Sequence, residues 1–475
     1  MKRKINKSTR RAFIAQTGTL AAGITLGANA VNAKSYSRIL GSNEKIRIGF
    51  IGVGNRGSQV LHDFMNEPDC EIAALCDVYQ PYLMRDRSKV DPRYIETRPG
   101  QVPKMGDKFQ NEVGQYTDYR KLLEDKTIDA VYIGTPDHWH ALQTIDTISS
   151  GKDVFVEKPL TKSIHEGRTI IKTLEKSSQI AGICLNRRGS GTYQKLAKEV
   201  PAGKIGKVTF AVSNHVSNMF PVGIGKMKPE RPPKDFNWDL WLGPKPYRPY
   251  QYNIAPYMFR WWEEYDNQIL NNGVHSLDLI RWLLNEKAPV AVTTLGGKYV
   301  IDDDRTIPDT MQTIFEFPSG TLATFTQLEA SSGSTLREGF LELRGTNGTL
   351  YIAGDNGYKI VPTSMGQFQS WDKLMDGEIY EVANAGNGKL IDGTYANPGA
   401  NLVRNFLDCI KSREMPIVSL QEGHLSTNMA HLATISMHVQ QTLKWDAEKE
   451  TVTNSEEANK LLAYEYREPW KLPLF

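Results

Sequence analysis

A glycine-rich turn between a strand pattern and a helix pattern constrains the fold of this 475-residue chain more than any other feature. Residues 45–51 alternate and then become wholly apolar, as a buried parallel strand does. They lead directly into Gly52-Val-Gly-Asn-Arg-Gly57, and after a helix pattern a second apolar run at 71–76 ends at Asp77. This succession of strand, G-x-G-x-x-G turn, helix and acid-terminated strand predicts a turn that holds the pyrophosphate of a dinucleotide.

Each residue of this turn has a physical task in that prediction. Gly52 permits the tight turn, Gly54 lets the backbone approach the pyrophosphate, and Gly57 lets the helix pack on the strand. Asp77 can accept hydrogen bonds from the adenosine ribose, and its charge would repel a 2′-phosphate, which favours NAD over NADP. The neighbouring Arg56 leaves NADP open. The candidate cofactor-binding residues here are Gly52, Gly54, Asn55, Arg56, Gly57 and Asp77.

Three further strand patterns also end in polar segments. Apolar runs at 129–134, 153–156 and 180–185 alternate with helix patterns. Parallel strands bind ligands where their carboxyl ends meet. The alternation predicts an α/β fold with an N-terminal, NAD-binding Rossmann domain at residues 43–186. Further candidate cofactor-binding residues at these strand ends are Thr135, Pro136, Trp139, His140, Glu157, Lys158 and Asn186.

The second half of the chain carries strand patterns that follow one another without helices between most of them. They lie at 207–214, 290–295, 310–317, 321–328 and 338–344. Strands clustered in this way indicate an antiparallel sheet. Residues 187–475 are therefore predicted to form a second α/β domain.

The first 33 residues resemble a twin-arginine export signal. Ser8-Thr-Arg-Arg-Ala-Phe-Ile14 is followed by a weakly apolar stretch to about Ala28, and small-residue cleavage sites end at Ala30 and Ala33. We expect residues 1–33 to be removed and the mature protein to be periplasmic.

Composition argues against two other classes of protein. Mean hydropathy is −0.43, and no apolar run approaches the ~18 residues of a spanning helix, so we expect no membrane span in the mature form. The formal net charge is +3, but six lysines and arginines lie among the first 33 residues, which leaves −3 for the remainder. Such a chain lacks the basic surface of a nucleic-acid-binding protein.

The cysteines and histidines do not suggest a metal site. The cysteine spacing fits neither a disulfide framework nor a zinc site, and free thiols are expected. The four cysteines are Cys70, Cys76, Cys184 and Cys409. His138 and His140 have no third ligand nearby in the sequence, so no metal is predicted.

Four motifs make the chain resemble the Gfo/Idh/MocA oxidoreductase family. They are the Gly52–Gly57 turn, Thr135-Pro-x-x-x-His140, Glu157-Lys-Pro159 and Asn271-x-Gly-x-His275. The stretch from Asn405 to Trp470 also fits the longer, exported members, so the resemblance covers nearly everything from Lys45 onward. It implies that the second domain has an open, mostly antiparallel sheet, that a helix at 424–443 packs back on the first domain, and that the protein is a homo-oligomer, a dimer or tetramer.

The resemblance and the chemistry of hydride transfer both point to Lys158 as the proton-handling group. Hydride transfer from a carbinol carbon needs a group that removes the hydroxyl proton. Lys158 ends a strand before a proline that the family commonly holds cis, and partial burial beside a positive nicotinamide would lower the pKa of its amine. Glu157 is expected to orient the carboxamide or a ribose, with an ion pair to Lys158 as the alternative.

Asn271 departs from the family's pattern, which is usually Asp-x-Gly-x-His. Asparagine can hydrogen-bond a sugar hydroxyl but cannot accept a proton as a base. Removal of the hydroxyl proton is therefore assigned to His275 and Lys158, and a mechanism that depends on a carboxylate at position 271 is put in doubt. The candidate catalytic residues are Lys158, His275 and Asn271.

Aromatic and arginine residues mark the expected substrate side. Flat aromatic faces pack against sugar rings, and arginine supplies fixed donors for hydroxyls or carboxylates. Residues 229–249 are expected to form a long ordered loop over the cleft. Of Arg187 and Arg188, one is expected to reach substrate or phosphate and the other to be solvated. The candidate substrate residues are Arg187, Tyr257, Arg260, Trp261, Asn271 and His275.

Three functions are compatible with these residues. The leading one is an exported, NAD-dependent oxidoreductase acting on a secondary alcohol of a sugar, glycoside or cyclitol. The alternative is an NAD-dependent glycoside hydrolase of the N-acetylgalactosaminidase type, which oxidises C3 transiently and eliminates the aglycone. The third is a sugar- or cofactor-binding protein without turnover. Because free NAD is scarce outside the cytoplasm, we expect a tightly bound cofactor.

Overall fold

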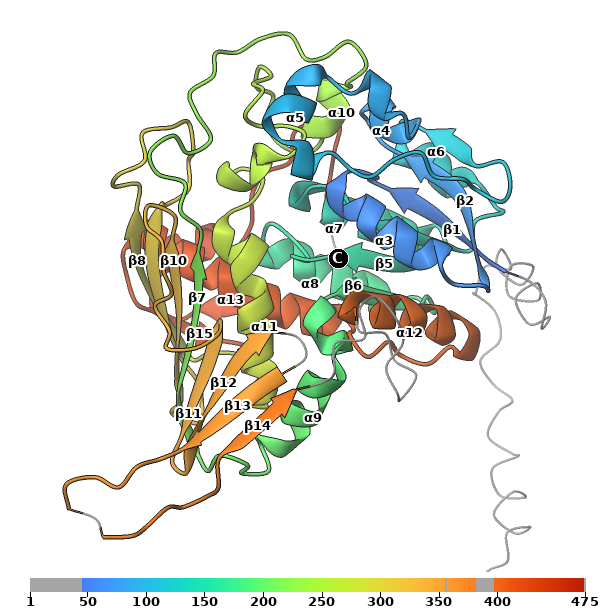
Figure 1. Cartoon of the computed structure of the whole chain (residues 1–475). Helices are drawn as coiled ribbons and strands as arrows, with labels where there is room; N and C mark the ends of the chain where they lie inside the picture. The colour runs from blue at the N-terminus through green and yellow to red at the C-terminus, as the bar shows by residue number, and fades with distance from the viewer. Residues whose placement is uncertain (1–44, 355–356, 369, 382–396, 474–475) are drawn as a thin grey trace, which may run out of the picture.

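Two β-sheets organise the protein (Figure 1). The computed structural model describes residues 45–354, 357–368, 370–381 and 397–473. The expected export signal at 1–33 lies outside these ranges. Among the described residues, no helix is both long enough and apolar enough to cross a bilayer.

The first sheet is parallel and has the strand order β3-β2-β1-β4-β5-β6. Its strands are β1 (Ile46–Ile51), β2 (Cys70–Cys76), β3 (Gly114–Tyr116), β4 (Ala130–Ile133), β5 (Asp153–Glu157) and β6 (Ala181–Cys184). The central strands are buried almost throughout, because helices pack on the sheet. Those helices are α3 (Asn55–Met65), α6 (Tyr119–Glu124), α7 (Asp137–Ser149), α8 (Ile164–Glu175) and α12 (Pro398–Ser412). The sheet confirms the Rossmann fold expected for the N-terminal part.

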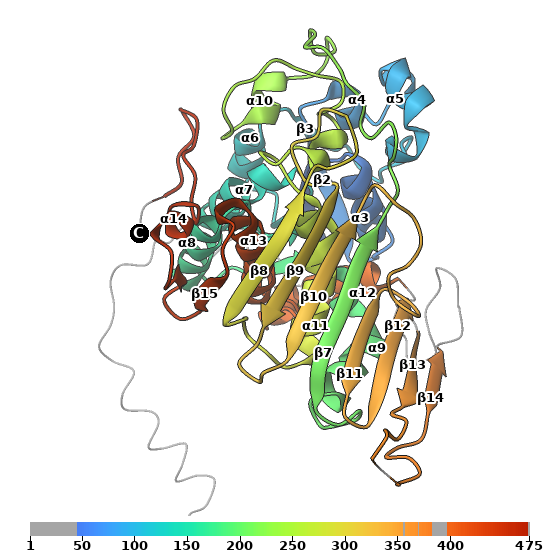
Figure 2. The ribbon, with the colours of Figure 1, turned by 90° about the vertical axis from the view of Figure 1, so that its left-hand side faces the viewer.

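The second sheet has the order β14-β13-β12-β11-β7-β10-β9-β8-β15-β16 and is mostly antiparallel, as expected. Its strands are β7 (Val208–Val216), β8 (Ala291–Gly297), β9 (Thr310–Glu316), β10 (Leu322–Leu328), β11 (Leu341–Gly345), β12 (Gly348–Gly354), β13 (Gly357–Pro362), β14 (Glu378–Glu381), β15 (Leu443–Asp446) and β16 (Thr451–Val452). β7 and β10 pair in parallel. In Figure 2 the sheet lies in front of α9 (Gly191–Glu199) and α11 (Val274–Leu283).

The C-terminal elements connect the two sheets. α13 (Leu420–Val439) contacts α8 beside the first sheet and both α11 and β8 in the second part. α12 packs on α3 and contacts β6. Near the chain end, the ring of Trp470 meets Trp139 of α7 edge-on, with 4.8 Å between the ring centroids. Of these elements, α13 packs against both the helices of the first sheet and the second sheet.

The cover expected over the cleft contains a short helix. Within residues 229–249, α10 (Trp238–Leu242) begins after Asn237, whose side chain accepts a hydrogen bond from the Leu240 amide at 3.0 Å. The remaining short helices are α4 (Gln80–Leu83), α5 (Pro92–Thr97) and α14 (Glu456–Lys460). Single turns of 3₁₀-helix lie at Arg87–Lys89, Pro99–Gln101, Asn186–Gly189 and Met258–Trp261, and a π-turn lies at Ile269–Gly273. All four cysteines are buried as free thiols.

Candidate active site

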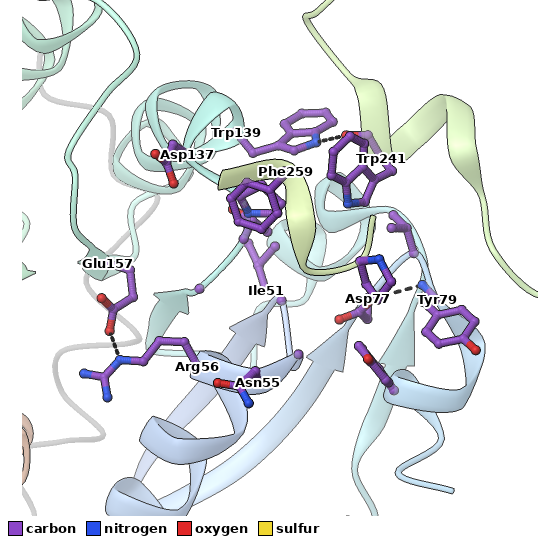
Figure 3. A pocket seen from close by; sticks show the side chains of 18 of the residues that line it. Ile51, Asn55, Arg56, Asp77, Tyr79, Asp137, Trp139, Glu157, Trp241 and Phe259 are labelled. Carbon is purple, nitrogen blue, oxygen red and sulfur yellow. Dashed lines mark hydrogen bonds and ion pairs between the residues drawn. The ribbon is translucent and has the colours of Figure 1, made fainter. Parts of the chain in front are cut away.

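A cavity of about 400 Å³ lies at the carboxyl edge of the first sheet (Figure 3). Its size is typical of small-molecule sites. The residues predicted from the sequence that line it are Gly52, Gly54, Asn55, Arg56, Asp77, Thr135, Pro136, Trp139, Glu157, Lys158, Asn186, Tyr257, Arg260, Asn271 and His275. Residues from both halves of the chain thus share one cavity.

The glycine turn at the mouth of this cavity has the shape a dinucleotide requires. Gly52 has φ +86°, and a Cβ there would lie 2.8 Å from the Gly134 carbonyl. A Cβ on Gly57 would lie 2.0 Å from the Gly52 oxygen, so α3 can approach the turn only because this residue is glycine. At Gly54, by contrast, a Cβ would meet only the ring of Tyr82, at 3.7 Å. Gly54 therefore borders open space at the helix N-terminus, and the turn fits a pyrophosphate.

Asp77 faces the same cavity from the end of β2 (Figure 3). Its Oδ2 accepts a hydrogen bond from the Val53 amide and its Oδ1 one from the Tyr79 amide, each at 2.9 Å. Burial raises the pKa of this carboxyl group against the effect of these bonds. The two amides fix the carboxyl group in place, and its oxygens keep lone pairs for hydroxyl donors.

Glu157 lines the cavity, but its carboxylate is engaged by the protein. Oε1 forms an ion pair with Arg56 Nε at 2.7 Å and accepts a hydrogen bond from Tyr132 at 3.1 Å. Burial favours the neutral acid, yet the charges of Arg56 and Lys158 together with the hydrogen bond from Arg56 leave the pKa of Glu157 below its ordinary value. The alternative given for Glu157, an ion pair with Lys158, is not formed: Glu157 pairs with Arg56, because α3 brings that guanidinium to the end of β5 (Figure 3).

Lys158 is held by the residue that replaces the family's aspartate. It follows β5, and its bond to Pro159 is cis. Its Nζ donates to the Asn271 backbone oxygen at 2.6 Å and to Asn271 Oδ1 at 3.0 Å. Burial lowers the pKa of the amine, which nearby carboxyl groups partly oppose. Asn271 acts here as a neutral acceptor that aims the lysine.

His275 lies one residue into α11 and also faces the cavity. Its Nδ1 is buried and has no hydrogen-bond partner among the described residues. Burial, with a further contribution from Lys158, lowers the pKa of His275 well below its ordinary value. The ring is therefore neutral and can hydrogen-bond a hydroxyl group in the cavity.

Four predicted site residues do not line the cavity, and one of them is Gly57, which packs α3 against the glycine turn. His140 is buried, with Nδ1 2.6 Å from the Pro159 oxygen and Nε2 2.9 Å from the Thr135 oxygen, so it ties two strand-end loops together. Trp261 donates through its indole N–H to Glu329 at 3.0 Å. Arg187 lies over the ring of Phe340 at 3.9 Å.

The expectation that the other arginine is solvated is wrong. Arg188 is buried and forms ion pairs with Asp278 and Glu422, each at 2.8 Å. α11 and α13 supply these two carboxylates, and only the tertiary packing of the helices brings them to the guanidinium.

Several residues that the sequence analysis did not select also line the cavity. They are Tyr79, Tyr82, Asp137, Phe236, Leu240, Trp241, Phe259 and Asn272, among others. Asp137 follows Pro136 in the Thr135-Pro-x-x-x-His140 motif, at the start of α7 beside the end of β4, so the motif could have pointed to it. Trp241 belongs to the expected cover, and its backbone oxygen accepts a hydrogen bond from the Trp139 indole at 3.0 Å (Figure 3).

Comparison with known proteins agrees with this architecture. "Oxidoreductase family, NAD-binding Rossmann fold" matches residues 46–184, "GFO/IDH/MocA C-terminal domain" matches 245–351, and "Oxidoreductase family, C-terminal alpha/beta domain" matches 375–472. The chain is similar to an alpha-N-acetylgalactosaminidase of Shewanella oneidensis, with 34% identity over 183 residues. That stretch covers 36% of this chain and only 38% of the relative.

Solved structures share the fold at low sequence identity. A levoglucosan dehydrogenase in complex with NADH and levoglucosan has a TM-score of 0.60 at 14% identity, covering 84% of this chain and 99% of its own. The WlbA dehydrogenase of Bordetella pertussis, in complex with NADH and UDP-GlcNAcA, has a TM-score of 0.58 at 16% identity, covering 85% and 99%. With matches along both halves and a fold of the same architecture, the chain belongs to the GFO/IDH/MocA family of NAD-binding oxidoreductases.

Proposed function

We propose that this protein is an exported, NAD-dependent enzyme that oxidises or reduces a secondary alcohol of a sugar, glycoside or cyclitol. The observation that carries the proposal is the Lys158 amine, held by Asn271 at 2.6 and 3.0 Å, in one cavity with His275 and the glycine turn. The sugar-binding dehydrogenases of the same fold support the substrate class. The twin-arginine pattern at 1–33 supports export.

NAD supplies a hydride acceptor when it is bound. The residues present fit it: the turn at Gly52 and Gly54 leaves room for the pyrophosphate at the N-terminus of α3, and Asp77 can accept the ribose hydroxyls. A carboxylate at position 77 would repel a 2′-phosphate, which favours NAD over NADP. Arg56, the nearest basic residue of the turn, is already paired with Glu157.

At the substrate end of the cavity, Lys158 is the base, the neutral His275 is a hydrogen-bonding group, and Arg260 is a cation held in place. Lys158, with its lowered pKa, accepts the hydroxyl proton, and the neutral His275 hydrogen-bonds the same or the adjacent hydroxyl. Arg260 lies against the rings of Tyr257 and Phe259, at 4.3 and 4.4 Å, which fixes its guanidinium for substrate oxygens.

The second candidate is an NAD-dependent glycoside hydrolase, and the galactosaminidase similarity favours it. The same lysine and histidine would serve a transient oxidation at C3. That oxidation acidifies the C2–H bond and permits elimination of the aglycone. The net products differ, because a dehydrogenase yields a keto sugar and NADH, whereas the hydrolase yields a free sugar without net NADH.

A panel of sugars, cyclitols and chromogenic glycosides separates these activities. We expect reduction of the bound nicotinamide without release of aglycone, measured together by absorbance. Release of aglycone without net reduction would assign the hydrolase instead. Neither signal across the panel, with bound nucleotide present, would leave a binding protein and contradict both enzyme proposals.

We also propose that the cofactor stays bound through purification. Denaturing the purified protein should release about one NAD per chain, measured by chromatography of the supernatant. Gly54→Ala is the matched variant, because its Cβ has room in the protein but projects where the nucleotide must approach. It should remain folded and release little nucleotide. A wild-type protein without nucleotide would contradict the proposal of tight binding.

A further inference from the structure

A second cavity lies at the end of β7, and the proposed reaction does not use it. Its volume is about 400 Å³, which is within the range of small-molecule sites. Its wall comes from the end of β7 and from the segment before β11, the neighbouring strand in the sheet (Figure 2). We call this cavity the distal pocket. The residues that line it are Asn214, His215, Val216, Asn218, Ser332, Gly333, Ser334, Gly339 and Phe340.

A side-chain contact links the distal pocket to the active-site cavity. Asn272 lines the active-site cavity, and its Nδ2 lies 3.4 Å from Nε2 of His215 in the distal pocket. Asn272 directly follows Asn271, the residue that holds the Lys158 amine. The distal pocket therefore borders the substrate end of the active-site cavity and not the glycine turn.

Arg187 provides a second connection between the two cavities. Its Nη1 donates to Ser276 Oγ at 3.4 Å, and Ser276 directly follows His275 on α11. The same guanidinium lies 3.9 Å from the ring centroid of Phe340, which lines the distal pocket. The arginine that the sequence marked as a substrate residue thus contacts both the helix that carries His275 and the wall of the distal pocket.

The chemistry of this wall suits a neutral ligand rich in hydroxyl groups. Its amide and hydroxyl side chains can both donate and accept hydrogen bonds. Burial lowers the pKa of His215, so its ring is neutral, and since Nε2 accepts from Asn272, Nδ1 carries the hydrogen and is a donor. Phe340 adds a flat apolar face of the kind that packs against a sugar ring.

We propose that the distal pocket is a subsite for a second sugar unit, so that the preferred substrate is a glycoside or an oligosaccharide and not a free monosaccharide. This inference rests on the proposed function, in which Lys158 and His275 act on a ring in the active-site cavity. A second ring joined to the first passes Asn272 and meets His215 and Phe340. Because the two rings are linked, the second adds contacts without a further loss of translational freedom.

Binding of matched sugars tests the subsite without turnover. Titration calorimetry of the full protein with NAD in excess compares glucose with cellobiose, galactose with lactose, and N-acetylglucosamine with N,N′-diacetylchitobiose. At least one disaccharide should bind about 10-fold more tightly than its monosaccharide, since one or two hydrogen bonds and a packed ring contribute that much. Equal affinities within every pair, or no binding by any of these sugars, would overturn the proposal.

Ser332→Trp and Ser331→Trp are the matched variants for this measurement. Both serines are exposed, but only Ser332 lines the distal pocket. An indole at position 332 can fill the pocket, while the hydrogen bond from Asn214 to Thr335, at 2.6 Å, still ties the segment to β7. Ser332→Trp should bring the ratio of the two affinities to about one, and Ser331→Trp should keep the wild-type ratio. A ratio that survives in Ser332→Trp, or is lost equally in both variants, would contradict the subsite.

Turnover distinguishes failure of the subsite from failure of the proposed function. With a disaccharide substrate, Ser332→Trp should lower kcat/KM about 10-fold, chiefly through KM, because the filled pocket is remote from Lys158. Turnover without any preference for a disaccharide would leave the proposed function standing and overturn the subsite. A disaccharide preference that Ser332→Trp abolishes, in a protein without turnover, would support the subsite and contradict the enzyme.

Discussion

Lys158→Met is expected to lower turnover by about 10²–10⁴-fold while the protein still binds NAD. Methionine keeps much of the side-chain length but cannot accept a proton, and the amine it replaces is the group that Asn271 aims into the cavity. The glycine turn and Asp77 lie elsewhere on the cavity wall and are untouched. Activity on the substrate found in the panel and nucleotide released on denaturation measure the two properties.

Lys172→Met provides the control for the lysine substitution. Lys172 lies on α8 and is not fully buried, so the same chemical change there removes a charge without reaching the cavity. It should keep full turnover. If Lys158→Met turned over substrate as fast as Lys172→Met, the proton would have to be removed by another group, and our assignment of Lys158 would be wrong.

Arg188→Met is expected to cost about 3–5 kcal/mol of unfolding free energy. The guanidinium is buried and donates to the buried Asp278 at 2.8 and 2.9 Å and to the partly exposed Glu422 at 2.8 Å. Its loss leaves buried negative charge that Arg281 must neutralise alone. Because Asp278 and Glu422 lie on α11 and α13, the damage affects the contact between the two halves of the chain. Urea unfolding followed by fluorescence measures the change.

The neighbouring arginine is the natural comparison for this substitution. Arg187 is half-buried and stacks on Phe340, and an exposed contact of this kind contributes up to about 1 kcal/mol. Arg187→Met should therefore change the unfolding free energy by no more than about that amount. Equal losses for the two variants would contradict the view that its ion pairs with Asp278 and Glu422 make Arg188 structurally essential.

The order of the elements and the dinucleotide turn could be predicted because their causes are local. A run such as 46–51 is buried on both faces wherever it lies in a parallel sheet, and its composition records this. Gly57 has to be glycine because a Cβ would lie 2.0 Å from the carbonyl oxygen of Gly52. The second sheet was predicted from the same kind of periodicity, and even the extent of the long C-terminal helix was close to that observed.

The partners of charged side chains could not be predicted in this way. Arg56 and Glu157 are 101 residues apart, and Lys158 and Asn271 are 113 residues apart. No local pattern distinguishes the buried Arg188 from the half-buried Arg187. The burial of such a charged side chain depends on which helix packs beside it in the folded protein.

The amino-acid sequence by itself determined two sheets, a dinucleotide turn and a lysine at a strand end, since sterics and periodicity act over a few residues. Only the tertiary structure decided that Asn271 holds this lysine and that Arg56 pairs with Glu157 beside it, because the state of a charge depends on distant segments that remove water and supply its partner.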